Sequence, residues 1–90
     1  MKSLSIGFPN NNMDRIKVLF FGELAELTAT SQLEVSGPLL LSELREELER
    51  NYPTLKDRVF QVAVNKRLAT GKEQLNNGDE VAFLPPFAGG

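Results

Sequence analysis

The chain of 90 residues contains no cysteine and no histidine. Without cysteine there are no disulfide bonds and no thiolate nucleophiles, and without histidine the commonest general base is missing. The same two absences remove most ligand sets for transition metals. A catalyst built from Asp, Glu and Lys alone remains open, but no segment concentrates these residues. If the chain takes part in chemistry, we expect it to present a group to the active site of another protein.

Long apolar runs and an excess of basic charge are also missing. No run of 18 apolar residues occurs, so we expect no membrane contact through a spanning helix. The formal net charge of −2 gives no electrostatic footprint for nucleic acid. Lys2 is followed by Ser3, Gly7 and Pro9 rather than by an apolar signal core, which predicts a cytoplasmic location.

The length and the apolar fraction of 41% predict one small globular domain. We expect residues 1–13 to be a flexible N-terminal extension, because Pro9 and the asparagines after it are typical of turn or coil. Whether this extension is a native arm stays open. The domain is expected at 14–84 and a flexible diglycine tail at 85–90, with Pro85 and Pro86 stiffening its exit.

Short segments rich in β-branched and aromatic residues predict strands at 16–21, 32–35, 59–64 and 80–84. A turn at 65–67 leads into a short returning strand at 68–69, and a second turn at 75–79 has Gly78 where a positive φ is expected. The first two strands are close enough in sequence for an antiparallel pair. The first and last are the most apolar, so we expect them side by side at the sheet centre.

The one long helix is predicted at 41–51, because Leu41, Leu44, Leu48 and Tyr52 recur at helical spacing. Ser42 is expected to help cap its start, and Glu46 to pair with Arg50. Its acidic outer face is interpreted as a solvated surface rather than a partner site. One main helix on one face of a mixed sheet of four to five strands makes a two-layer α+β domain. The helix is expected to cover Ile16, Val18, Phe20, Leu33, Val35, Val62, Val64, Val81 and Phe83.

The same alternation places Leu19, Phe21, Ala82 and Leu84 on the opposite face of the sheet. An uncovered apolar patch of this kind often marks a partner site. The alternative is that residues 22–31 fold over it. We favour the partner site, because the tail leaves from the same strand end.

The chain ends on Gly89 and Gly90, a pair that arises by chance in roughly one chain in 200. One interpretation is an ordinary frayed terminus. The other is a carboxylate carried on a thin segment that can enter an active site where any Cβ would clash. Six extended residues, 85–90, reach at most about 20 Å.

Three segments of the chain resemble the small subunit of molybdopterin synthase, a ubiquitin-like β-grasp sulfur-carrier family. They are Ile16-Lys17-Val18-Leu19-Phe20-Phe21, Val62-Ala63-Val64-Asn65, and the run from Gly78 through Phe83-Leu84-Pro85-Pro86-Phe87-Ala88-Gly89-Gly90. The resemblance extends from Asp14 to Gly90, and its specific part is the aromatic strand followed by Pro-Pro-x-x-Gly-Gly.

The resemblance implies that an ATP-dependent enzyme adenylates Gly90 and that a sulfur donor then converts it to a thiocarboxylate. The tail (Pro85, Pro86, Phe87, Ala88 and Gly89) would enter the large subunit of a heterotetrameric synthase, where sulfur passes to the cyclic pyranopterin precursor. Phe21 and Leu84 fall at the hydrophobic interface with that subunit, although the family often has an aromatic residue in place of Leu84. The chain would bind no cofactor itself, and the catalytic acid and base groups would belong to the large subunit.

Three other interpretations stay open. Sulfur carriers of thiamine synthesis share the fold and the diglycine end, but are usually shorter and lack the Phe-x-Pro-Pro approach. A ubiquitin-like modifier would be conjugated to lysines through Gly90. A plain interaction domain with an accidental tail is the third.

Overall fold

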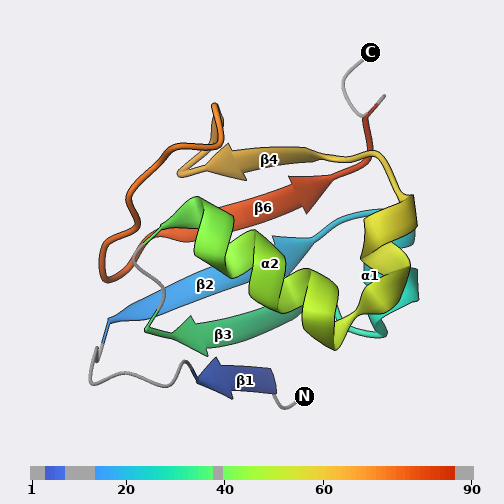
Figure 1. Cartoon of the computed structure of the whole chain (residues 1–90), viewed down its shortest axis with the longest axis horizontal. Helices are drawn as coiled ribbons and strands as arrows, with labels where there is room; N and C mark the ends of the chain where they lie inside the picture. The colour runs from blue at the N-terminus through green and yellow to red at the C-terminus, as the bar shows by residue number, and fades with distance from the viewer. Residues whose placement is uncertain (1–3, 8–13, 38–39, 87–90) are drawn as a thin grey trace.

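The computed structural model describes residues 4–7, 14–37 and 40–86, and within these ranges six strands form one mixed sheet. The strand order is β1-β3-β2-β6-β4-β5. Helix α2 lies across one face of this sheet, and α1 lies at one end (Figure 1). The elements are β1 (Leu4–Gly7), β2 (Arg15–Phe20), α1 (Glu23–Thr28), β3 (Gln32–Ser36), α2 (Leu41–Asn51), the 3-10 helix η1 (Pro53–Asp57), β4 (Gln61–Val64), β5 (Arg67–Leu68) and β6 (Glu80–Leu84).

The centre of the sheet is the parallel pair of β2 and β6, as the sequence predicted. Val18 is opposite Val81 and Phe20 is opposite Phe83. On either side, β3 pairs antiparallel with β2, and β4 pairs antiparallel with β6. The strands that begin and end the predicted domain therefore lie side by side in the middle of the sheet.

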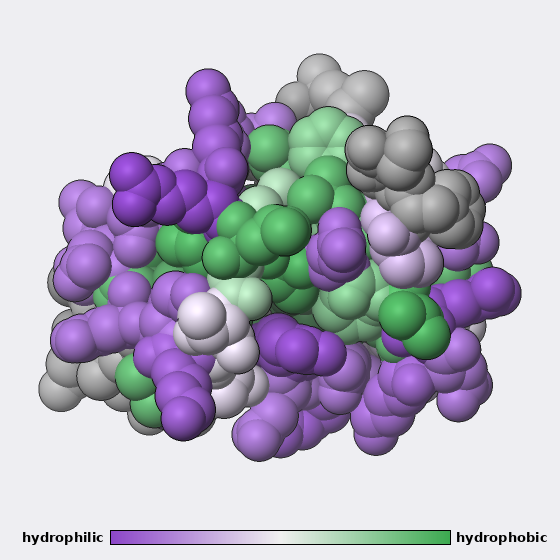
Figure 2. Space-filling view, turned by 90° about the horizontal axis from the view of Figure 1, so that it is seen from above, coloured by the Kyte–Doolittle hydropathy of each residue, from purple (hydrophilic) through white to green (hydrophobic). Residues whose placement is uncertain are grey.

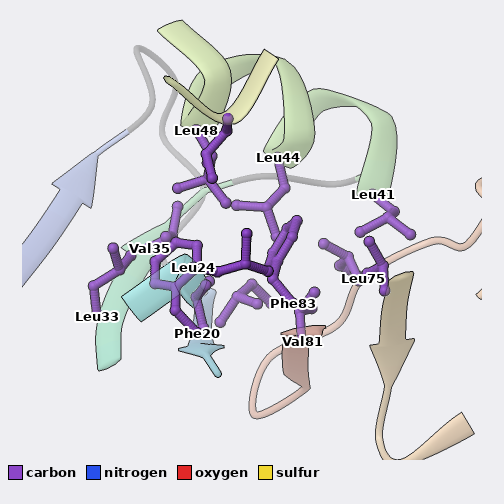
Figure 3. Close-up of a cluster of buried hydrophobic side chains, with 14 residues drawn as sticks. Phe20, Leu24, Leu33, Val35, Leu41, Leu44, Leu48, Leu75, Val81 and Phe83 are labelled. Carbon is purple, nitrogen blue, oxygen red and sulfur yellow. The ribbon is translucent and has the colours of Figure 1, made fainter. Parts of the chain in front are cut away.

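The core fills the space between α2 and the sheet. Leu41, Leu44 and Leu48 point from α2 toward the strands, and Val81 and Phe83 meet them from β6 (Figure 3). The Phe83 ring lies 5.5 Å from the Phe20 ring and 5.4 Å from the Phe60 ring, centroid to centroid. Every residue expected beneath the helix is buried except Val64, which is half-buried. Leu55 of η1 and Leu75 complete the core and were not predicted, because neither belongs to a periodic segment.

Helix α2 has the bounds that the leucine spacing predicted, but its capping differs. The carboxylate of Glu43, not the hydroxyl of Ser42, caps the first turn by accepting a hydrogen bond from the Leu40 N–H at 3.0 Å. Arg50 pairs with Glu47 one turn away at 2.5 Å rather than with Glu46. Such exposed pairs contribute less than about 1 kcal/mol, so the leucine stripe rather than the charges stabilises this helix.

Strand β1 differs from the expected organisation, which assigned residues 1–13 to an extension in front of the domain. Leu4–Gly7 instead pairs in parallel with β3, from Leu4 opposite Leu33 to Gly7 opposite Ser36. The physical reason is that β3 would otherwise be an edge strand with unpaired N–H and C=O groups. Backbone pairing of this kind needs no particular side-chain pattern, so the composition of the segment gave no indication of it.

The β4–β5 hairpin has a tighter turn than the one predicted at 65–67. Asn65 and Lys66 have φ values of 49° and 71°, as in a two-residue type I′ turn, whose twist matches that of the flanking strands. Strand β5 therefore begins at Arg67, one residue early, and β4 begins at Gln61 rather than 59. The shorter turn places Leu68 directly opposite Ala63.

Candidate functional site

The sheet face opposite α2 carries an apolar row that crosses four strands. Leu19 of β2 is opposite Ala82 of β6, Ala82 is opposite Ala63 of β4, and Ala63 is opposite Leu68 of β5. Because side chains alternate along a strand, all four lie on the side away from the helix. Phe21 directly follows β2 and Leu84 ends β6, so these two extend the row toward the tail. We name these six residues the outer-face patch.

The most accessible members of the outer-face patch are Leu68 at 66% exposure and Phe21 at 45%. Leu19, Ala82 and Leu84 are half-buried, and Ala63 is buried at 6%. The structure thus brings together the four residues that the alternation predicted. Leu68 was missed because the predicted three-residue turn left its face undefined. Asn65 fits the two-residue turn, but Lys66 stands where that turn usually has glycine, so the sequence gave only a weak signal of it.

Residues 22–31 do not shield this patch. Helix α1 lies within that segment and its Leu24 is fully buried in the core cluster beneath α2. Thr28, at the other end of α1, is also buried, and its hydroxyl donates a hydrogen bond to the Leu24 carbonyl oxygen at 2.9 Å. The segment therefore packs toward the helix layer. Among the described residues, the apolar side chains of the outer face have no covering element.

The chain leaves the sheet beside Gly22. Pro85 follows β6, is half-buried, and has its ring against Gly22, where a Cβ would lie 2.9 Å from the Pro85 Cγ. The backbone of Gly22, with φ 57° and ψ −135°, is one that residues with a side chain rarely adopt. The Phe21 N–H also donates to the Phe83 carbonyl oxygen at 3.0 Å. These contacts fix the start of the tail next to Phe21. The predicted tail residues Phe87, Ala88, Gly89 and Gly90 lie outside the described residues.

We expect Gly22→Ala to lower the free energy of unfolding by about 1–3 kcal/mol, because it adds backbone strain and forces Pro85 to shift. Urea denaturation would measure the change. Gly78→Ala is the matched control, since Gly78 also has a positive φ of 89° but no atom lies within 4 Å of the position that a Cβ would take there. Equal losses in both variants would show that the contact with Pro85 adds nothing.

The model of the ThiS family matches residues 18–90. The chain belongs to this family. Relatives with similar sequences include the molybdopterin synthase sulfur carrier subunits of Mycobacterium tuberculosis, 37% identical over 87% of this chain and 100% of the relative, and of Escherichia coli, 38% identical over 83% and 99%. The residues matched by the ThiS family include the diglycine end and the strand before it.

Solved structures place this ThiS-family chain among ubiquitin-like β-grasp proteins. A putative molybdopterin converting factor subunit 1 from Pyrococcus furiosus aligns with a TM-score of 0.76 at 26% identity, over 81% of this chain and 98% of that one. SAMP1 from Haloferax volcanii aligns with 0.71 at 26%, over 84% and 99%. One chain from a structure of the complex of subunits 1 and 2 of molybdopterin-converting factor from Helicobacter pylori aligns with a TM-score of 0.66 at 27% identity, over 84% of this chain and 99% of that one.

Neither a metal centre nor a membrane-spanning helix is found in the described part of the ThiS-family chain. No three Asp or Glu side chains in residues 4–7, 14–37 and 40–86 are grouped to hold a metal ion. No helix there is both long and apolar enough to cross a bilayer.

Proposed function

We propose that this chain is the sulfur carrier subunit of a molybdopterin synthase and that the carboxylate of Gly90 carries the sulfur. The observation that carries the proposal is the likeness to sulfur carrier subunits, at 37% identity over 87% of the chain. The outer-face patch beside the departing tail supports it, because a carrier must be held by the enzyme that receives its end. This function would be carried out in the cytosol.

The order of chemical steps follows from the α-carboxylate, whose pKa is near 3.5, so that the group is an anion at pH 7. An anion is a poor electrophile, and activation must come first. In an adenylating enzyme a carboxylate oxygen of Gly90 attacks the α-phosphorus of ATP, and pyrophosphate leaves. Sulfide released by a donor then attacks the acyl carbon, AMP leaves, and loss of the S–H proton gives the thiocarboxylate. The thiocarboxylate is a soft nucleophile, so this chain needs no cysteine to carry sulfur.

The large synthase subunit is the proposed partner of the outer-face patch. The Helicobacter pylori structure holds subunits 1 and 2 of its converting factor together, and its similarity to this chain supports the same pairing here. Phe21 is an aromatic anchor of the type that dominates binding energy at interfaces. With the patch docked, the tail reaches at most about 20 Å into the large subunit, which would supply the general acid and base groups.

Mass spectrometry of the intact protein tests the proposal. With a matching activating enzyme, ATP and a sulfide donor, we expect a species heavier by the difference between sulfur and oxygen, localised to Gly90 by fragmentation. The same reaction without ATP is the control. If Gly90 keeps only its carboxylate in the complete reaction, the carrier proposal fails.

A protein modifier is the second candidate, and the similarity to SAMP1, a small archaeal modifier protein, favours it. Conjugation would join the Gly90 carbonyl to a lysine amine of another protein. Lysine adducts that carry the C-terminal glycines, found in peptide digests from the native host, would establish this function. A third candidate is a sulfur carrier of thiamine synthesis. To distinguish it, the chain loaded with sulfur at Gly90 is supplied in separate reactions to thiazole synthesis and to the pyranopterin precursor. A thiamine carrier would deliver sulfur only to thiazole synthesis.

A further inference from the structure

Val59, in the connection between η1 and β4, is the most exposed large apolar side chain of the described residues. Its exposed fraction is 76%, compared with 66% for Leu68 and 45% for Phe21. The function proposed above does not use it. An isolated exposed valine is common on protein surfaces and indicates nothing by itself. The position of Val59 in the fold is what gives it meaning.

Val59 points to the outer face of the sheet. The next residue, Phe60, points the other way, because its ring centroid lies 5.4 Å from that of Phe83 and 5.1 Å from the guanidinium carbon of Arg45 on α2. The preceding residue, Arg58, has an extended backbone with φ −116° and ψ 144°. Successive side chains of an extended segment point to opposite sides. Val59 therefore points away from α2.

Val59 also lies beside the place where the chain leaves the sheet. We name Leu84, Pro85 and Pro86 the tail root. The antiparallel register places Gln61 opposite Leu84, and two more residues of the same register bring Val59 beside Pro86. Figure 1 shows the connection from η1 entering β4 at the point where β6 ends. Proline has no N–H to donate, so the ladder between the two strands stops there.

Contacts on the helix side hold the segment before β4 in this position. The Arg58 guanidinium lies 3.8 Å from the carboxylate of Glu23, the first residue of α1. Glu23 directly follows Gly22, against which the Pro85 ring packs. The Arg58 N–H donates to the Leu55 carbonyl oxygen at 3.2 Å. The residues on both sides of Val59 are thus fixed next to the tail root.

Phe21 lies on the other side of the tail root. Strand β6 is between β2 and β4, and the register of Phe20 opposite Phe83 places Phe21 beside Leu84. Two exposed apolar side chains, Phe21 and Val59, therefore flank the end of β6 on the same face of the sheet. Figure 2 views the molecule from the side of β4 and shows apolar residues that reach the surface, bordered by hydrophilic ones.

We propose that Val59 is a second apolar anchor for the large synthase subunit, which contacts the tail root on both sides. This inference rests on the proposed function. The large subunit is the occupant because Val59 continues, on the same face, the surface that this subunit covers at Phe21 and Leu84. A partner that holds both sides of the tail root fixes the direction in which the chain continues into its active site, as productive transfer requires.

Calorimetric titration of the unloaded full chain with the large subunit tests this contact. Val59→Asp should raise the Kd about tenfold or more, since most of a valine side chain would otherwise be removed from water. Val59→Thr, which has the same shape with a hydroxyl in place of one methyl, should raise it several-fold. Val59→Ile should stay within about twofold of the native affinity, because it keeps both the β-branch and the apolar surface.

Thr54→Asp is the matched control for the added charge. Thr54 is exposed on η1, which packs against α1 and α2 rather than on the outer face. Its Kd should stay within about twofold of the native value. All four variants should keep the native unfolding midpoint by circular dichroism. In the native chain, the methyl NMR signals of Val59 should shift when the large subunit is added, and those of half-buried Val64 should shift less.

Three outcomes would overturn the proposal. Native affinity in a folded Val59→Asp chain, or Val59 methyl signals that do not respond to the large subunit, would show that the contact ends at Leu84. An equal loss of affinity in Thr54→Asp would assign the effect to charge. Because the titration uses the unloaded chain, a Gly90 that takes up no sulfur would contradict the proposed function alone, whereas native affinity of Val59→Asp would contradict this inference alone.

Discussion

Deletion of Gly90 is expected to reduce sulfur delivery more than 100-fold while leaving the unfolding midpoint unchanged. The deletion leaves a glycine carboxylate at the chain end, but that group falls up to about 3.5 Å short of its position in the partner's active site. Misplacement by about 1 Å can cost 100-fold in rate, so the loss should exceed that. Stability should not change, because the core residues found in the described part of the chain lie between Ile16 and Phe83. Single-turnover transfer to the pyranopterin precursor and thermal denaturation are the two measurements.

The control is a chain with one alanine added after Gly90. It keeps both glycines but moves the carboxylate outward and gives it a Cβ, so delivery should fall similarly. If the extended chain works as well as the native chain, the position of the carboxylate is not what Gly90 provides. If the deletion lowers the unfolding midpoint by several degrees, the tail contributes to the fold and the loss of delivery has a second cause.

The sequence predicted the elements whose apolar residues recur at a regular spacing. The leucines of α2 and the alternating residues of β2 and β6 follow the spacing that burial on one face requires, so the helix bounds, the central pair and the buried face were all predicted correctly. Phe21 and Leu84 were placed away from the helix by the same alternation. That they bind a partner stays a prediction.

Features that depend on single contacts between distant residues were not predictable. Strand β1 forms by pairing with the backbone N–H and C=O groups at the edge of β3. Leu55 enters the core from η1, which is too short to show a periodic pattern of apolar residues. The exposure of Leu68 depends on whether the turn has two residues or three. The turn of the chain after Ala69 depends on hydrogen bonds from the Thr70 and Gly71 N–H groups to the Glu73 carboxylate, and no pattern in the sequence indicates them.

Phe21→Asp is expected to weaken binding of the large synthase subunit by about 30- to 1,000-fold, which corresponds to roughly 2–4 kcal/mol. Phe21 is 45% exposed and lies where the tail begins, so its ring is available to a partner without any change in the core. A carboxylate there would be buried against apolar surface without a counter-charge. The backbone N–H of residue 21 can still donate to the Phe83 carbonyl oxygen, so the free energy of unfolding should change by less than about 0.5 kcal/mol.

Leu40→Asp is the matched control, because Leu40 is 44% exposed and precedes α2 rather than the tail. It introduces the same charge at a side chain of similar exposure, and binding should stay within about twofold of the native affinity because a surface change outside the contact is worth less than about 0.5 kcal/mol. Calorimetric titration with the large subunit measures both variants, and circular dichroism reports their folding. A Phe21→Asp chain that is folded and binds normally would remove the outer-face patch from the interface. An equal loss in Leu40→Asp would show that added negative charge, not the loss of the ring, weakens the complex.

The Leu68→Asp variant tests how far the contact extends across the sheet. Leu68 and Leu19 lie at opposite ends of the apolar row. A loss of affinity comparable to that of Phe21→Asp would therefore require the large subunit to cross all four strands from β2 to β5.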